Sequence, residues 1–279
     1  MAKKALVIGC WYKVGKMKRL DAGDDAIIVA SHLRDRKYTD VRLMLDKDTK
    51  DWESFGIGTW LREDFLGGKV LPTKNNITNA MEWLVKDAKS GDRLFLFFAG
   101  HGGQIKDKDG DEKKTDKLDE YIATMDDKKL TDDEMHGILI KGLPKGVRLN
   151  AVFDCCHSGT ILDLRYLENK GKLRTNTSKH DSDAHVVLLS GCKDNETADD
   201  SDWDDNTKST NLGLLAGGLF THALAKYHNE GDKEAPTFNE LLKSIREYVR
   251  QKEVGSKYHQ SVQMSTSLKF DLDEEKYRI

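Results

Sequence analysis

Two apolar runs end abruptly in small and reactive residues. The run Phe95–Gln104, FLFFAGHGGQ, presents His101 among glycines, and the run Asn150–Asp163, NAVFDCCHSGTILD, presents Cys156. A short apolar run bounded by glycine is typical of a buried strand, and parallel α/β sheets place their ligand crevice beyond the carboxyl ends of the strands. If the two strands are neighbours, the histidine and the cysteine face each other, which suggests a cysteine nucleophile with a histidine base.

A cysteine needs help to act as a nucleophile, because a thiol pKa of about 8.5 leaves only a small thiolate fraction at neutral pH. A nearby imidazole raises the reactive fraction and can protonate a leaving amine, and His101 is suited to that role. The glycines around it leave room for a substrate backbone. Their amides, with the amide of Cys156, can form an oxyanion hole, in which one donor contributes about 3–4 kcal/mol in the transition state.

Other interpretations of these residues stay open at this point. Cys156 can be an inert buried thiol, although His-Ser-Gly follows it rather than more strand. His157 competes with His101 as the base, but neighbours in an extended chain point to opposite sides. A zinc site from both histidines, Cys155 and Cys156 is too cramped for tetrahedral ligation. Cys155 itself is expected to pack on the far side of the strand end.

Alternating strands and helices must position these residues. The apolar patterns predict strands at Ala5–Gly9, Val41–Leu45, Arg93–Ala99, Arg148–Phe153, Val186–Ser190 and Val262–Leu268. They predict helices at Gly23–Arg34, Asn75–Ala88, Thr131–Lys141, Leu214–Tyr227 and Phe238–Gln251. Such alternation indicates an α/β protein, with a mostly parallel central sheet and helices on both faces.

Local signals refine this scheme. Asn75 or Asn76 is expected to cap the second helix, and Thr131 with Glu134 has the pattern of a capping box. The charged stretch 105–127 predicts a small hairpin.

Composition excludes several classes of protein. The chain has 279 residues, a formal net charge of −3 and 33% charged residues, so no nucleic-acid or membrane partner is expected. Its apolar runs are shorter than the roughly 18 residues of a membrane helix. Four cysteines in a chain of this length do not make a disulfide framework, which fits a reduced setting, cytoplasmic or nuclear. Two polar stretches, 47–69 and 193–213, are predicted to be irregular insertions.

The sequence blocks resemble a known family. GHGG and DCCHSG, with Cys156 fifty-five residues after His101, resemble the catalytic dyad of the metacaspases, caspase-related cysteine peptidases of fungi, plants and protists. Further blocks extend the resemblance from near residue 4 to near residue 270: KALVIG, MEWLVKDA, DGDE, TDDEMHGILIK, GVRLNAVFDCCHSGTILDL and LLSGCKDNETA. No long insertion separates the two halves, which favours type I.

This resemblance implies one caspase-like peptidase domain over residues 1–279, folded as a caspase-like sandwich. It divides into a large-subunit-like part, 1–168, a basic linker, 169–183, and a small-subunit-like part, 184–279. The resemblance also implies a monomer, because metacaspases do not use the strand through which caspases dimerise. The chain begins almost at the first predicted strand, so the prodomain of some relatives is not expected.

An acidic pocket is predicted next to the nucleophile. Asp154 lies at a strand end, where an unpaired buried carboxylate is costly, and an Arg or Lys of a substrate would pair with it. The resemblance implies this S1 pocket with Asp25 as its second carboxylate, and Asp24 is the competing residue as an ordinary first-turn acid. It also implies an oxyanion hole from the amides of Gly102 and Cys156. Two polar pocket residues of the family are replaced here, by Ala99 and Ala22.

A calcium site is implied in the same way. Four carboxylates match the calcium-binding aspartates of type I metacaspases: Asp119, Asp132, Asp133 and Asp163. Converging carboxylates repel unless a cation holds them, and oxygen ligands suit Ca²⁺. From the sequence alone, helix capping would also explain Asp132 or Asp133, and solvent exposure the others. The motif DKDGDE at 107–112 is not an EF-hand, because its glycine is fourth rather than sixth.

The basic linker is predicted to be mobile and open to self-cleavage, since exposed loops are preferred sites of proteolytic nicking. Its candidate cut sites are Lys170, Lys172, Arg174 and Lys179.

The sequence therefore predicts a calcium-activated cysteine endopeptidase that cleaves protein or peptide substrates after Arg or Lys. The alternative from another class is a calcium-responsive interaction or quality-control protein with incidental peptidase activity. An Asp-specific caspase would need a basic S1 pocket, and none is found near the dyad. A legumain-like relative would lack the DGDE and DDEMH blocks.

Overall fold

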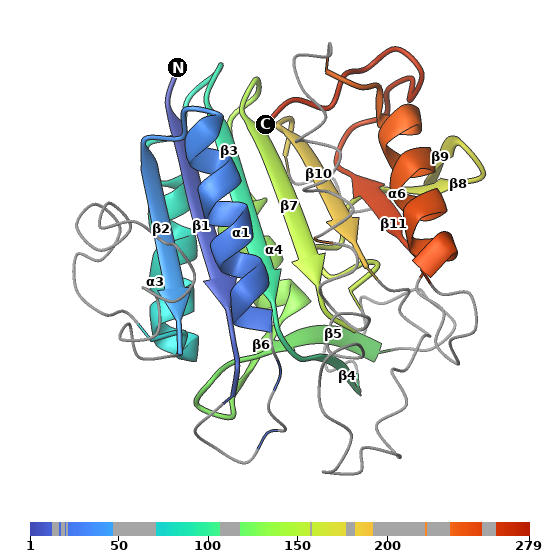
Figure 1. The fold of residues 1–279 in the computed structure, drawn as a ribbon. Helices are drawn as coiled ribbons and strands as arrows, with labels where there is room; N and C mark the ends of the chain where they lie inside the picture. Colours follow the sequence, from blue (N-terminus) through green and yellow to red (C-terminus); the bar gives the residue numbers. More distant parts are fainter. Residues whose placement is uncertain are drawn as a thin grey trace.

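The computed structural model describes residues 1–12, 17, 20, 22–46, 71–106, 118–156, 158–176, 182–191, 221, 235–252 and 261–279. These residues form an eight-stranded sheet in the order β2-β1-β3-β7-β10-β11-β8-β9, and a three-stranded sheet in the order β4-β5-β6. Figure 1 shows the small sheet beyond the lower ends of the central strands. In the described part of the chain, no helix combines the length and apolar character that crossing a membrane requires.

Five strands of the large sheet run parallel, as the sequence predicts. They are β2 (Asp40–Leu45), β1 (Lys3–Gly9), β3 (Arg93–Ala99), β7 (Arg148–Asp154) and β10 (His185–Ser190). The two at the centre, β3 and β7, are buried over almost their whole length, and β3 is apolar from Leu94 to Ala99. A strand that is apolar on both faces is expected where helices cover both sides of the sheet.

Helices cover both faces of the sheet, so the predicted α/β class is confirmed (Figure 1). On one face lie α1 (Ala22–Asp35) and α6 (Phe238–Lys252), packed against Phe95 and Phe97. On the other lie α3 (Lys74–Val85) and α4 (Asp132–Leu139), packed against residues such as Phe98 and Phe153. Alternate residues of each strand thus supply two separate cores, which hold the strand ends that carry the site.

The predicted mobile linker was wrong over much of its length. Residues 166–169 form β8 and 172–175 form β9, an antiparallel hairpin that extends the sheet through β11 (Gln263–Thr266). Lys170 and Gly171 make its turn with φ of 51° and 76°, as a two-residue hairpin turn of the mirror-image type requires. Glu168, almost wholly buried, pairs with Arg246 at 2.5 Å. This long-range support explains why a charged sequence is ordered here.

Two helix N-caps were predicted from the sequence, and the structure confirms one of them. Thr131 and Glu134 form the predicted capping box at the start of α4. The predicted asparagine cap of α3 was wrong, because the N-cap is Thr73, whose hydroxyl accepts a hydrogen bond from the amide of Asn76. Threonine serves well at this position.

The small sheet follows His101 directly. Its strands are β4 (Gly102–Lys106), β5 (Leu118–Ala123) and β6 (Lys129–Thr131). The antiparallel β4–β5 pair corresponds to the hairpin expected at 105–127, but it begins earlier, at Gly102. Turns and irregular backbone occupy residues 158–165, after Cys156. The insertions expected at 47–69 and 193–213 lie outside the described residues, as does the helix expected at 214–227 apart from Thr221.

Candidate active site

His101 and Cys156 follow adjacent parallel strands at equivalent positions. In the β3–β7 register Ala99 pairs with Asp154, so each reactive residue lies two positions beyond the last pair. Both residues are partly exposed. A Cβ on Gly102 would collide with the carbonyl oxygen of Cys156. Glycine is therefore required at 102, and the two loops approach each other closely at the backbone.

The two neighbouring cysteines differ in their surroundings. Cys155 is buried and belongs to the core on the α3 and α4 face, which is the packing role expected from the sequence. Burial raises the pKa of its thiol well above the ordinary value, and the nearby Cys156 adds to the shift. The Ser158 hydroxyl donates a 2.7 Å hydrogen bond to the Cys155 carbonyl and fixes the turn. Cys156 is thus the more accessible thiol of the pair, while His157 lies outside the described residues.

Two buried carboxylates lie near the loop that carries Cys156. Asp154 is 2% exposed and Asp25, in the first turn of α1, is 6% exposed. Burial raises the pKa of Asp154 well above its usual range, and the charge of Asp25 raises it further. This influence of Asp25 on Asp154 indicates that the two predicted pocket residues lie near each other. Asp24, the competing residue, is only partly buried.

Asp154 is satisfied at one oxygen only. Its Oδ2 accepts hydrogen bonds from the amide and the hydroxyl of Thr221, at 3.2 and 2.5 Å. Its buried Oδ1 has no hydrogen-bond partner among the residues that the structure describes. No local sequence pattern indicates this role for Thr221, which lies 67 positions away along the chain. Ala99 and Ala22, the two departures from the family pattern, are both buried.

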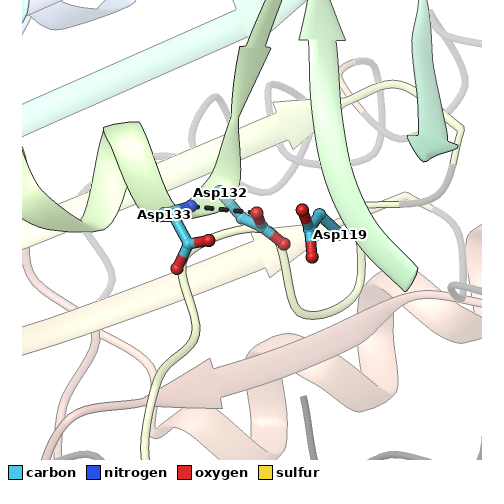
Figure 2. A group of neighbouring side chains, drawn as sticks. All are labelled: Asp119, Asp132 and Asp133. Carbon is cyan, nitrogen blue, oxygen red and sulfur yellow. Dashed lines mark hydrogen bonds between the residues drawn. The ribbon is translucent and has the colours of Figure 1, made fainter. Parts of the chain in front are cut away.

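Three of the four predicted metal ligands form a cluster. Ligand oxygens of Asp119, Asp132 and Asp133 all lie within 4.8 Å of one another. Figure 2 shows Asp119 on β5 facing the other two at the start of α4. Burial raises the pKa of Asp132 to about 9, and the charge of Asp163 is the second cause. Asp163, the fourth predicted ligand, is therefore close to Asp132 but outside the tight group.

A fifth carboxylate, which adjoins Asp119 in the sequence and competes with it as a candidate ligand, connects this acidic cluster to the segments that follow His101 and Cys156. Glu120 is fully buried, and its amide donates a 2.7 Å hydrogen bond to Asp132. Its carboxylate accepts hydrogen bonds of 3.0 Å from Gln104, on the strand after His101, and from Thr160, in the turns after Cys156. The acidic cluster and the reactive residues thus share one hydrogen-bonded framework.

Three of the four candidate self-cleavage residues lie in the described part of the chain. Lys170, Lys172 and Arg174 are exposed, but all three belong to the β8–β9 hairpin. Lys179 lies outside the described residues.

Parallel strands between two helical layers, with a histidine and a cysteine beyond adjacent strands, define a caspase-like protein. The chain belongs to the metacaspase family of cysteine peptidases, because the family model of the metacaspase, peptidase C14 domain, matches residues 3–165.

Individual relatives agree with this assignment. Metacaspase-1 of Mycosarcoma maydis is 31% identical over 321 residues, covering 97% of this chain and 72% of the relative. Metacaspase-3 of Trypanosoma brucei brucei is 36% identical over 226 residues, covering 76% of this chain and 60% of the relative. Metacaspase-1 of Candida glabrata is 34% identical over 254 residues, covering 73% and 60%. The chain spans between 60% and 72% of the length of these relatives.

A solved structure is similar over the whole fold. Protein GSU0716 from Geobacter sulfurreducens matches with a TM-score of 0.62 and 21% identity, covering 100% of this chain and 98% of that chain. At this level of identity the likeness shows the fold alone.

Proposed function

We propose that this chain is a calcium-activated cysteine endopeptidase that cleaves proteins after Arg or Lys, with Cys156 as nucleophile and His101 as acid and base. Family membership supports a cysteine peptidase. The observation that carries the specificity is the pair of buried carboxylates, Asp25 and Asp154, beside the cysteine loop.

The proposed dyad, His101 and Cys156, lies beyond the ends of two adjacent strands and carries out the reaction there. His101 takes the thiol proton of Cys156, the thiolate attacks the scissile carbonyl, and the resulting imidazolium protonates the leaving amine. The neutral imidazole then deprotonates the water that hydrolyses the acyl-enzyme and releases the Cys156 sulfur. The amides of Gly102 and Cys156 are proposed to stabilise the oxyanion. The close approach of Gly102 to the Cys156 carbonyl supports this role, because it brings both backbones to one place.

The P1 cation is proposed to bind Asp154. A carboxylate at full burial is unfavourable unless it is paired, and Oδ1 has no partner among the described residues while Thr221 satisfies Oδ2. A guanidinium or ammonium group would donate to the free oxygen and neutralise part of the negative charge that Asp25 shares. An acidic P1 side chain would add negative charge beside these two buried carboxyl groups and is therefore rejected.

The acidic cluster fits calcium by its chemistry. Its donors are carboxylate oxygens from Asp119, Asp132 and Asp133, with Asp163 nearby, and hard oxygen ligands are what Ca²⁺ takes. Bound calcium would offset the repulsion between these groups. The Glu120 hydrogen bonds to Gln104 and Thr160 then keep the strand after His101 and the turns after Cys156 in a fixed relation.

Calcium is expected to stabilise the protein as well as activate it. At about a hundredfold excess over its dissociation constant, a ligand stabilises the folded state by about 2.7 kcal/mol, which raises the thermal midpoint by several degrees. The Asp132→Asn variant keeps an acceptor for the Glu120 amide but removes a charge, so the calcium-induced shift should disappear. Differential scanning fluorimetry with calcium, magnesium or chelator measures this.

The exposed Asp40, at the start of β2, provides the matched control. Calcium should raise the thermal midpoint of Asp40→Asn as much as it raises that of the unchanged protein. An equal calcium shift in Asp132→Asn would remove the cluster from the proposal.

Self-cleavage in the linker is expected at Lys179 before the hairpin sites. A peptidase binds its substrate as an extended single strand, whereas Lys172 and Arg174 are paired with β8 and Lys170 is in the turn. Lys179→Ala should therefore slow calcium-induced nicking, and Arg174→Ala should not. Intact mass spectrometry of timed samples identifies the bond, and a first cut after Arg174 would show that the hairpin opens before cleavage.

Matched fluorogenic peptides ending in Arg, Lys or Asp test the proposal directly. Calcium-dependent hydrolysis after Arg and Lys, with none after Asp, is the expected result. Hydrolysis after Asp would overturn the roles given to Asp25 and Asp154, and equal rates with calcium and chelator would overturn activation by calcium. The monomeric state and the cytoplasmic or nuclear location stay predictions.

A further inference from the structure

His101 lies at the point where the chain leaves one sheet for the other. β3 ends at Ala99 in the large sheet, and β4 begins at Gly102 in the small one. A residue at such a crossing is not held by the large-sheet ladder. Yet an acid–base residue must be held close to its productive geometry, since a misplacement of about 1 Å can reduce the rate about a hundredfold.

Tyr12 supplies the missing contacts. Its hydroxyl accepts a 2.9 Å hydrogen bond from the His101 amide and donates a 2.8 Å hydrogen bond to the Ala123 carbonyl. The Ala123 amide donates a 2.9 Å hydrogen bond to the His101 carbonyl. The three residues therefore close a ring of hydrogen bonds that uses both backbone groups of His101.

The aromatic ring of Tyr12 also contacts the imidazole. The two ring centroids lie 4.6 Å apart with planes tilted by 40°, within the range of favourable ring contacts. Tyr12 is 3% exposed, and burial raises the pKa of its hydroxyl well above the usual value. The hydroxyl therefore stays protonated and remains a donor to Ala123 throughout the neutral range.

Tyr12 is itself fixed from the end of β2. Asp46, which follows that strand, accepts hydrogen bonds from the amides of Trp11 and Tyr12, both at 2.7 Å. Tyr12 has a φ of 54°, a left-handed conformation that an aromatic residue adopts only when its surroundings impose it. The paired acceptors of Asp46 impose it here, and they aim the side chain at His101.

Gly100, which precedes His101, must lack a side chain for Tyr12 to fit. A Cβ on Gly100 would lie 2.5 Å from the Tyr12 hydroxyl oxygen, which is too close for any side chain. The glycine before the histidine thus makes room for the tyrosine hydroxyl.

We propose that Tyr12 is a positioning residue for the reaction: it holds His101 through the ring of hydrogen bonds with Ala123 and through the contact with the imidazole, and Asp46 holds Tyr12. This inference rests on the proposed function, in which His101 is the acid and base. Tyr12 touches neither substrate nor Cys156 in this role.

Tyr12→Phe tests the inference, because it keeps the ring contact and removes the hydrogen bonds of the hydroxyl to His101 and Ala123. The expected result with an Arg peptide and calcium is a kcat lower by about 10–100-fold, with KM within about threefold of its original value. Rates are normalised to active sites titrated with an irreversible Arg-directed inhibitor. A merely structural role would lower the number of active sites and leave kcat per site unchanged.

Tyr38→Phe is the matched control. Tyr38 is equally buried, and its hydroxyl has no hydrogen-bond partner within the described part of the chain. It lies just before β2, at the opposite end of that strand from Asp46. Its kcat per active site should match that of the unchanged protein.

Three outcomes would overturn the inference. An unchanged kcat in Tyr12→Phe, beside an inactive His101→Ala, removes the role of Tyr12 and leaves the dyad intact. An equal fall in Tyr38→Phe shows a general response to losing a buried hydroxyl. Full activity in His101→Ala removes the proposed dyad and this inference together.

Discussion

Cys156→Ala is expected to abolish peptide hydrolysis, with kcat lower by at least about 10⁴-fold. Removing the nucleophile of a coupled catalytic pair costs nearly as much as removing the whole pair, and alanine offers the histidine no proton to accept. The measurement is hydrolysis of an Arg peptide with calcium at high enzyme concentration. Unchanged thermal stability shows that the variant is folded, which is expected because Cys156 is only partly buried.

The adjacent cysteine gives the control for this variant. Cys155 is buried in the core, and burial raises the pKa of its thiol. Cys155→Ala should therefore lose some stability, because it leaves a small cavity, and its kcat should stay within about threefold of the original value. Alkylation with iodoacetamide before digestion should modify Cys156 much faster than the buried Cys10 and Cys155. A Cys156→Ala protein that still hydrolyses the peptide would move the nucleophile elsewhere and favour a different class of function.

Asp154→Asn is expected to lower kcat/KM for Arg and Lys peptides by about 10²–10³-fold. Removing one partner of a buried, hydrogen-bonded charge pair costs about 2–5 kcal/mol, and each 1.4 kcal/mol is about tenfold. The asparagine keeps an oxygen for the two Thr221 hydrogen bonds, so the loss reports the charge rather than the shape. Steady-state kinetics with matched Arg, Lys and citrulline peptides measures it, and citrulline should lose little.

The same variant should not lose stability. The pKa of Asp154 is raised by burial and by Asp25, so the folded state retains a proton that the unfolded chain releases. For such a group, stability falls as pH rises through and above the unfolded pKa. A neutral isostere removes that cost at neutral pH, and the thermal midpoint should stay equal or rise.

Asp24→Asn is the matched control for the pocket. Asp24 adjoins Asp25 in the first turn of α1 but is only partly buried, and the effect of its substitution on kcat/KM should stay within about twofold. A large loss in Asp24→Asn, with little loss in Asp25→Asn, would exchange the roles of these two residues. Equal cleavage of the Arg peptide by Asp154→Asn would contradict the proposed pocket.

The strands and the helix nearest the site could be predicted from the sequence, because the patterns that indicate them span only a few neighbouring residues. Arg93–Ala99 contains the apolar run Leu94–Ala99, and Arg148–Asp154 contains the shorter run Ala151–Phe153, which is what strands covered on both faces require. The capping box of Thr131 and Glu134 fixes the start of α4 within four residues. The pairing of His101 with Cys156 follows once the two strands are taken as neighbours.

What the sequence did not reveal depends on distant partners. The β8–β9 hairpin looked like a mobile basic loop because its order comes from β11 and from Arg246, 78 positions from Glu168. Thr221 and Asp154 are 67 positions apart, and Tyr12 and His101 are 89 apart. No periodicity or short motif contains such pairs, because each depends on how the folded sheet brings distant parts of the chain together.

The strand order also determines what a cut in the linker can do. The strands that follow the linker, β10 and β11, lie between β7 and β8, which precede it. A chain nicked at Lys179 would therefore remain an interlocked two-piece protein, with the later piece hydrogen-bonded to the earlier one along both of its edges. The pieces could neither separate nor exchange between molecules without opening the sheet, so cleavage would alter the freedom of the linker ends and leave the body of the enzyme assembled.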